Sequence, residues 1–211
     1  MAQHRESSGI PLTNAYFSFD LPGSWEELDL KPLTRDRSIK YLVDARVRDI
    51  PEFRPHRGEF VAYLRRVAAQ AWDGGARYCA AFCRPAGDGL ITGSLTVTVL
   101  PSAPGDNPVE DIVEQLQQRD PAAGDGLWSS LTHVELPGGG AGARQFGVRE
   151  VRIDAGGTAV KHVFMYTFLP IDGAVVMVAC ASPAVDLADP LLELFGHVSD
   201  TFVIRPLEAG E

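Results

Sequence analysis

The sequence is poor in the residues that carry metal, redox or disulfide chemistry. Its 211 residues include 3 cysteines, 3 methionines and 5 histidines. The odd set of cysteines (Cys79, Cys83 and Cys180) lacks the spacing of an extracellular disulfide framework, and no histidines pair at metal-ligand spacing. We therefore expect a reduced, cytoplasmic protein with no disulfide, no metal and no cofactor.

Long apolar segments are missing as well. The polar N-terminal residues lack the apolar centre of a signal peptide, and the longest apolar run, Ala174–Ala181, is far too short to cross a bilayer. The sequence therefore predicts neither an export signal nor a transmembrane segment.

Motifs that would support catalysis are missing too. There is no Gly-x-Ser-x-Gly nucleophile motif, and the glycine-rich stretch 138–142 precedes a strand pattern where a dinucleotide-binding loop would open a helix. Cys180 follows an apolar stretch without a basic neighbour, which is typical of an inert buried thiol. His162 has no partner that identifies it as a general base. We predict that the protein is not an enzyme.

What the sequence does contain is an uneven distribution of charge. The formal net charge is −9, yet ten lysines and arginines and five acidic residues lie between Lys31 and Arg66, a local balance of +5. The remaining 175 residues therefore carry −14. Because phosphate neutralisation needs a positive footprint, this acidic remainder disfavours general nucleic-acid binding.

The apolar content is sufficient for an ordinary core. Hydrophobic residues make up 45% of the sequence and charged residues 22%, as in typical globular proteins. We see no long linker, low-complexity tract or internal repeat. The prediction is one domain spanning residues 1–211.

The first third of the chain predicts strands followed by a helical hairpin. Tyr16–Leu21 alternates as a strand does, Pro22–Ser24 indicates a turn, and Trp25–Leu30 predicts a second strand with Trp25 in the core. Residues 34–73 then change to helical spacing, with Thr34 as a cap, prolines between two helices and a Gly-Gly pair at the end. This pattern predicts an inserted basic αα-hairpin over residues 34–73.

The remainder predicts mostly strands. The alternation of threonine and serine with apolar residues from Thr92 to Val99 indicates one solvent-facing and one buried side. Helices are predicted from Pro108, with Asn107 as its cap, and from Asp189 to about Val198, and a last strand at 201–204. The other strand candidates are Tyr78–Arg84, Leu90–Leu100, Ser129–Leu136, Ala143–Ile153, Val160–Leu169 and Ala174–Ala181. Together they predict an α+β fold: a twisted antiparallel sheet of six or seven strands with helices on one face.

Both ends of the chain resemble the PsbP-like family, which includes photosystem accessory proteins, a Ran-binding nuclear factor and small bacterial proteins. Phe17–Trp25 has the form of the family's opening motif, and Val175–Cys180, Pro190–Val198 and Ser199–Phe202 resemble its last strand, closing helix and tail. The resemblance implies an accessory or binding role and supplies no catalytic residues. The hairpin departs from the family pattern, and its composition resembles that of actinobacterial proteins.

The basic side of the hairpin is the candidate partner-binding site. An arginine-rich surface suits an acidic protein partner, because arginine makes planar bidentate contacts with carboxylates. On the family resemblance, we expect that partner in a secretion or envelope-associated system. The candidate residues are Arg35, Arg37, Lys40, Arg46, Arg48, Arg57, Arg65 and Arg66.

Other interpretations of the same residues stay open. A solvated helical face with no partner explains the charges equally well, and self-association would bring the hairpin onto the acidic remainder of a second copy. Insertion of Phe60 and Trp72 into an anionic lipid surface is a further alternative. A different class of function is a small-molecule-binding protein or uncharacterised enzyme with a pocket between the sheet and the inserted helices.

Overall fold

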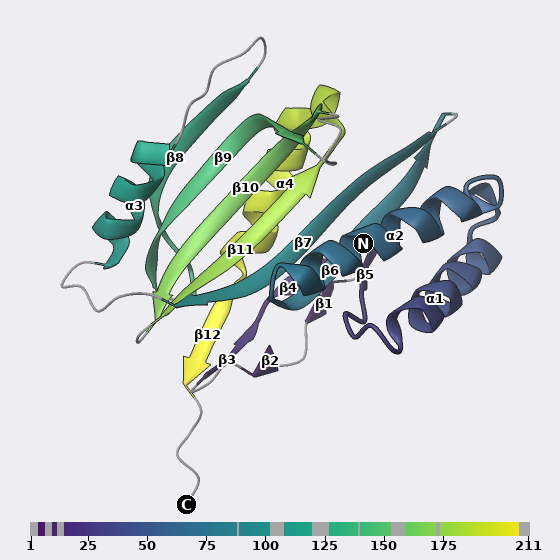
Figure 1. The fold of residues 1–211 in the computed structure, drawn as a ribbon, viewed down its shortest axis with the longest axis horizontal. Coiled ribbons are helices and arrows are strands. Elements are labelled where there is room, and N and C mark those ends of the chain that lie inside the picture. The colour runs from purple at the N-terminus through teal and green to yellow at the C-terminus, as the bar shows by residue number, and fades with distance from the viewer. Residues whose placement is uncertain are drawn as a thin grey trace, which may run out of the picture.

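The central element is an antiparallel sheet of seven strands in the order β5-β6-β7-β11-β10-β9-β8 (Figure 1). The computed structural model describes residues 4–6, 10–11, 15–87, 89–101, 108–119, 127–138, 140–152, 159–171 and 174–206. The seven strands are β5 (Trp25–Glu27), β6 (Ala76–Ala86), β7 (Gly89–Pro101), β8 (Trp128–Glu135), β9 (Ala141–Arg152), β10 (Ala159–Ile171) and β11 (Ala174–Ser182). The α+β class and the predicted strand number are confirmed.

Tight hairpins join most neighbouring strands. Between β6 and β7, Ala86 pairs with Gly89, and Gly87 adopts a φ of 57°, a left-handed conformation that favours glycine. The β7–β11 pairing instead joins strands that are far apart in sequence, and it aligns Leu95 with Cys180. Asn107, the predicted cap of a helix, lies outside the described residues.

The two ends of the chain do not extend the central sheet. Strand β3 (Ala15–Ser18) pairs with β12 (Val203–Pro206) and with β2 (Ile10–Pro11), while β4 (Asp20–Pro22) pairs with β1 (His4–Glu6). The backbone N–H of Asp20 also donates to the Thr201 hydroxyl at 2.9 Å. The strands predicted at 16–21 and 201–204 therefore form small sheets of their own beneath the main one.

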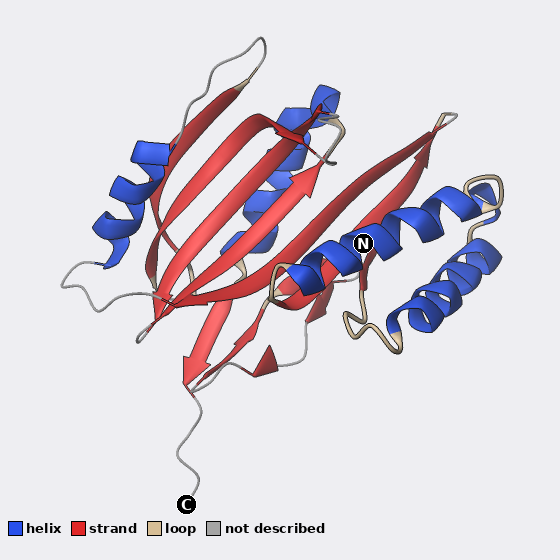
Figure 2. Ribbon diagram, viewed as in Figure 1, coloured by secondary structure: helices blue, strands red, loops and turns tan. Residues whose placement is uncertain are grey.

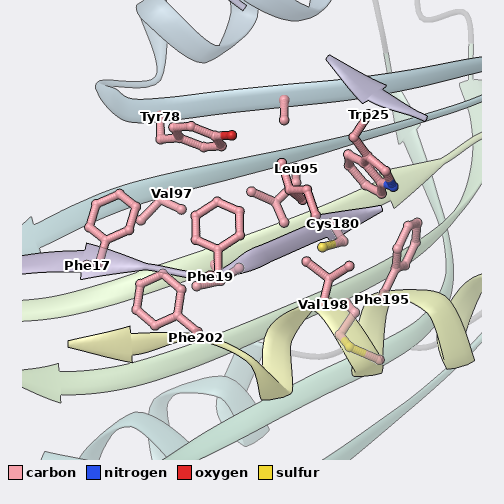
Figure 3. Close-up of a cluster of buried hydrophobic side chains, with 14 of the residues drawn as sticks. Phe17, Phe19, Trp25, Tyr78, Leu95, Val97, Cys180, Phe195, Val198 and Phe202 are labelled. Carbon is pink, nitrogen blue, oxygen red and sulfur yellow. The ribbon is translucent and has the colours of Figure 1, made fainter. Parts of the chain in front are cut away.

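One face of the central sheet carries an aromatic core. Phe17, Phe19 and Phe202 stack with ring centroids 5.2–6.0 Å apart, and Tyr78 meets both Phe17 and Phe19 edge-on (Figure 3). These rings come from both chain ends and from the sheet. Helix α4 (Ala188–Asp200), which follows the short helix η2 (Val185–Leu187), covers the same face and buries Phe195 completely.

The opposite face carries the helical hairpin. It consists of α1 (Arg35–Asp49), the 3₁₀ turn η1 (Pro51–Phe53) and α2 (Arg57–Asp73), which confirms the helices predicted between 34 and 73. Thr34 occupies the position before α1, but its side chain bonds Asp29 instead of capping the helix, which lowers the pKa of Asp29. A second cluster of buried residues forms here: Leu28, Ile39, Val43, Phe53, Phe60, Leu64, Val67, Ala68, Ala71, Cys79, Ala81 and Cys83.

The sequence predicts helices on one face and an inserted hairpin without placing the hairpin, which lies on the face opposite α4. Strand β6 alternates: Tyr78, Ala80 and Phe82 join the core under α4, whereas its intervening residues join the cluster under α2. Figure 2 shows α4 behind the sheet and the hairpin in front. The remaining helix, α3 (Pro108–Arg119), contacts β9 and β10. The physical reason lies in β6 itself: it is apolar on both sides, so it is covered on both sides.

The expectation of a solvent-facing polar side on β7 is also only partly correct. Ser94 and Thr96 are half-buried, but Thr92 and Thr98 are buried. The Tyr63 hydroxyl of α2 bonds Thr92, and burial raises the pKa of Tyr63. The polar residues on this face of β7 predict exposure to solvent, but the hairpin covers part of it.

Candidate functional site

Two ion pairs fix α1 against α2. An Nη atom of Arg57 lies 2.5 Å from an Asp44 carboxylate oxygen, and Arg65 Nε lies 3.4 Å from Asp36. Both pairs fit the same antiparallel register between the two helices. Two of the predicted site residues, Arg57 and Arg65, are thus bound to carboxylates of their own hairpin.

Arg46 has a third internal role, because it joins α1 to the edge of the sheet. One Nη atom lies 3.2 Å from Glu26 of β5 and donates to the Ser24 carbonyl at 3.2 Å, in the turn between β4 and β5. Its side chain is only 20% exposed. The sequence carries a signal for these pairings, since Asp36 and Asp44 stand within the basic run, but their partners depend on how the helices pack.

The other candidate residues lie at the surface of the hairpin. Arg37, Lys40 and Arg48 are exposed on α1, and no carboxylate of the described residues forms an ion pair with them. Arg35 is half-buried at the first position of α1. Arg66 is exposed on α2 and lies over the Tyr63 ring of the same helix, 5.8 Å from its centroid.

Arg37, Tyr41 and Arg48 share one stripe of α1. Their spacings of 4 and 7 residues return to the same side of a helix with 3.6 residues per turn, opposite the buried Ile39 and Val43. Tyr41 is 78% exposed, so most of its side chain is open to contact with a partner. We call Arg37, Tyr41 and Arg48 the α1 outer stripe. The charge pattern of the sequence indicates its two arginines, but no sequence signal singles out Tyr41.

A pocket lies on the other face of the sheet. It has a volume of about 610 Å³ and opens between the β4–β5 turn, the β6–β7 strands and the start of α4. The sequence analysis expected a pocket between the sheet and the inserted helices, whereas this one lies against α4; on the hairpin side, residues of β6 and α2 pack together in a buried cluster. The lining residues are Pro22, Gly23, Ser24, Phe82, Arg84, Ile91, Leu187, Pro190, Leu191 and Leu194.

The three cysteines are protonated, and His162 is hydrogen-bonded to an arginine. Burial raises the pKa of Cys79, Cys83 and Cys180 to about 12, so all three are neutral thiols near pH 7. His162 accepts a hydrogen bond from Arg149 Nε at 3.2 Å, and burial lowers its pKa. Across the described ranges, no group of three or more histidine, cysteine or acidic side chains is placed to hold a metal ion.

The helices give no sign of a membrane span. In the parts of the chain that the structure describes, no helix combines the length and the apolar character that crossing a bilayer requires.

Comparisons with known proteins leave the family open. No protein-family model matches the sequence, and no curated protein matches it. Among solved structures, the chain is similar to the crystal structure of LpqN, described as involved in cell envelope biogenesis of Mycobacterium tuberculosis. The identity is 14% and the TM-score 0.49, over 98% of this chain and 92% of that one. At this level the likeness assigns neither family nor function, and membership of the PsbP-like family stays a prediction.

Proposed function

We propose that this protein is a non-catalytic binding protein that recognises an acidic segment of another protein through the α1 outer stripe. The observation that carries the proposal is an exposed tyrosine flanked on one helix face by two arginines without ion-pair partners among the described residues. Tyrosine and arginine are the residue types that dominate the binding energy of protein interfaces.

The chemistry of the stripe suits carboxylates. Each guanidinium presents a planar fork that matches a carboxylate, and a tyrosine ring adds contact area at low entropic cost. The inward side of α1 is anchored by Ile39 and Val43, so the outer stripe is held in place without a partner. A surface that is already ordered loses less entropy on binding.

A separate protein is a better partner than a second copy of this chain. Contact between the hairpin of one copy and an acidic surface elsewhere on another would be head-to-tail, and such contacts continue into open filaments unless the rotation closes. We therefore propose a distinct acidic partner. On the resemblance to the PsbP-like family, we place that partner in a secretion or envelope-associated system. On its cysteine content, we place the protein itself in the cytoplasm.

The state of the ionisable groups supports a role without catalysis. The three buried cysteines are thiols and not thiolates at neutral pH, and the Nε2 of His162 is occupied by Arg149. Neither group is therefore prepared as a nucleophile or a general base.

The test begins with affinity purification of the tagged protein from its native cells at low and moderate salt. Each stoichiometric partner is then produced separately, and its affinity is measured for the wild type and for the double variant Arg37→Glu/Arg48→Glu. A matched control, Arg77→Glu/Arg205→Glu, makes the same change of net charge at exposed positions on β6 and β12. We expect the stripe variant to weaken binding at least tenfold and the control to weaken it by less than twofold.

Two results would overturn the proposal. Equal loss in the stripe variant and the control would mean that only net charge matters, and full binding by the stripe variant would place the interface elsewhere. Sedimentation of the purified protein is a further measurement. Oligomers that form in the wild type and are absent in the stripe variant would identify a second copy of this chain as the partner of the stripe.

A further inference from the structure

We propose that the pocket beside α4 binds a compact apolar anion, such as an aromatic or branched aliphatic carboxylate or sulfonate, whose charge is held by Arg84. The inference does not depend on the proposed partner surface, which lies on the other side of the sheet. A volume of about 610 Å³ falls in the range of clefts that enclose small-molecule ligands.

Three separate elements build the pocket walls. The β4–β5 turn contributes Pro22–Ser24, α4 contributes Leu191 and Leu194, and η2 contributes Leu187. Leu191 belongs to the buried core, so the α4 wall continues the aromatic core of Figure 3 outward. These walls are apolar, which selects a ligand with an apolar body.

A glycine shapes the floor. Phe82 and Gly93 are paired residues on β6 and β7, and a Cβ at Gly93 would lie 2.3 Å from Phe82 Cε1. The Phe82 ring therefore lies over the backbone of β7, a position that any larger residue at 93 would block. Trp25 contacts the same ring with centroids 4.9 Å apart and fixes it. Ile91, which lies two residues before Gly93 on the same side of β7, completes the floor.

Arg84 gives the pocket its charge. It pairs with Ile91 across the β6–β7 ladder, so its side chain stands at the edge of the apolar floor. Arg84 is exposed, and no carboxylate of the described residues forms an ion pair with it. The nearby acidic residues of η2 and α4, Asp186 and Asp189, do not line the pocket. A guanidinium beside apolar walls favours an anionic group on the ligand.

The β4–β5 turn, which forms one wall of the pocket, is held in place by α1. Arg46 of α1 donates to the Ser24 carbonyl at 3.2 Å and pairs with Glu26 at 3.2 Å. This contact fixes the turn that carries Ser24, whose hydroxyl is the other polar side chain in the lining. A pocket whose walls are fixed before binding loses less entropy when a ligand enters.

The test uses two fluorescent probes of nearly the same shape. 1-Anilinonaphthalene-8-sulfonate is an apolar anion, and N-phenyl-1-naphthylamine is its neutral counterpart. Both are titrated into the folded wild type and into Arg84→Gln, with Arg77→Gln as the matched control on the same strand. A third variant, Leu194→Trp, fills the pocket from α4, and circular dichroism verifies that each variant is folded.

We expect the wild type to bind the sulfonate at least tenfold more tightly than the neutral probe, an advantage that falls as salt rises. Arg84→Gln should remove that advantage and leave neutral-probe binding unchanged, and Leu194→Trp should weaken both probes. Arg77→Gln should change neither. Unchanged sulfonate affinity in Arg84→Gln would overturn the role of Arg84. Unchanged binding of both probes in Leu194→Trp would place the site elsewhere and overturn the proposal.

Discussion

The two faces of the sheet are stabilised in different ways. The α4 face is built from aromatic rings that come from both chain ends and from the strands, with Phe17, Phe19 and Phe202 at its centre. The hairpin face is built from one continuous stretch of chain together with small residues of β6 such as Cys79 and Ala81. The first face joins distant parts of the sequence, and the second attaches a local unit.

This difference assigns separate tasks to the two faces. Large rings drawn from distant segments bury much apolar surface, and their contacts form only when the whole chain is folded. The hairpin contributes an apolar cluster of its own, packed on small residues of β6, and ion pairs near the surface, which stabilise little. We infer that the α4 face sets the global stability, while the hairpin opens more easily and presents its outer stripe to a partner.

The largest difference in stability between the two faces is expected when one buried phenylalanine of each face is replaced by alanine. Phe195 lies in α4, belongs to the same buried cluster as Trp25 and is fully buried, whereas Phe60 in α2 stacks on Phe53 at 5.2 Å. Phe195→Ala should lower the free energy of unfolding by about 3–5 kcal/mol. Phe60→Ala should lower it less, because the hairpin opens while the sheet stays folded. Urea unfolding followed by circular dichroism measures both, and equal losses would contradict the division between faces.

The next largest effect on stability is expected when two separate glycines on the α4 side are compared. Gly93→Ala would force the Phe82 ring out of its position, and overpacking of this kind costs about 1–3 kcal/mol. Gly196→Ala in α4 is the control, because nothing lies within 4 Å of its added Cβ. That control should stabilise the helix by about 0.5–1 kcal/mol. Thermal unfolding compares the two variants, and a stabilised Gly93→Ala would refute the account of the pocket floor.

Thiol labelling compares the opening of the two faces directly. Burial raises the pKa of Cys79 and Cys180 to about 12, so at pH 8 both react only after local opening. In variants that retain one cysteine each, Cys79 under the hairpin should react about tenfold faster than Cys180 under α4. Labelling followed by mass spectrometry gives both rates, and equal rates would mean that the faces open together.

The same raised pKa values have a consequence for stability. The unfolded thiols ionise near the ordinary value of 9.0, below the folded value of about 12. The folded state therefore keeps its full free energy of unfolding below pH 9. As the pH rises towards 12, the unfolded thiols ionise while the buried thiols stay protonated, so the free energy of unfolding falls. Cys180→Ala should make the loss of stability in alkaline solution less steep.

The smallest effect is expected at the ion pair between the hairpin helices. Asp44 and Arg57 are each 41% exposed, so Asp44→Asn should cost about 0.2–1 kcal/mol at low salt. In 1 M salt, where charges are screened within about 3 Å, the difference between wild type and variant should vanish. A loss that persists at high salt would show that packing, not charge, joins α1 to α2.

Much of the fold was predictable because it is encoded locally. Helical spacing between Thr34 and Trp72, period-two alternation in the strands and Gly-Pro turn signals placed most elements within a few residues of their observed bounds. These signals survive because each element has a single period and clear ends. The basic hairpin was found in the same way, by counting charges along 36 residues.

The candidate sites were less predictable because they depend on contacts across the chain. Arg46, Arg57 and Arg65 look like partner-binding residues in the sequence, but packing pairs them with carboxylates 20, 13 and 29 positions away. The pocket beside α4 is lined by residues that are as far apart in the sequence as Pro22 and Leu194, so no short sequence motif indicates it. Arg84 was therefore passed over.

The sequence by itself determined the α+β class, an antiparallel sheet of six or seven strands and the two helices of the hairpin, since spacing and turn residues specify local structure. Only the tertiary structure decided that α4 and the hairpin lie on opposite faces and that Thr92 is buried. It also placed the end strands β3 and β12 in a sheet of their own. The reason is physical: a strand such as β6, apolar on both sides, specifies that both faces are covered but not which element covers each.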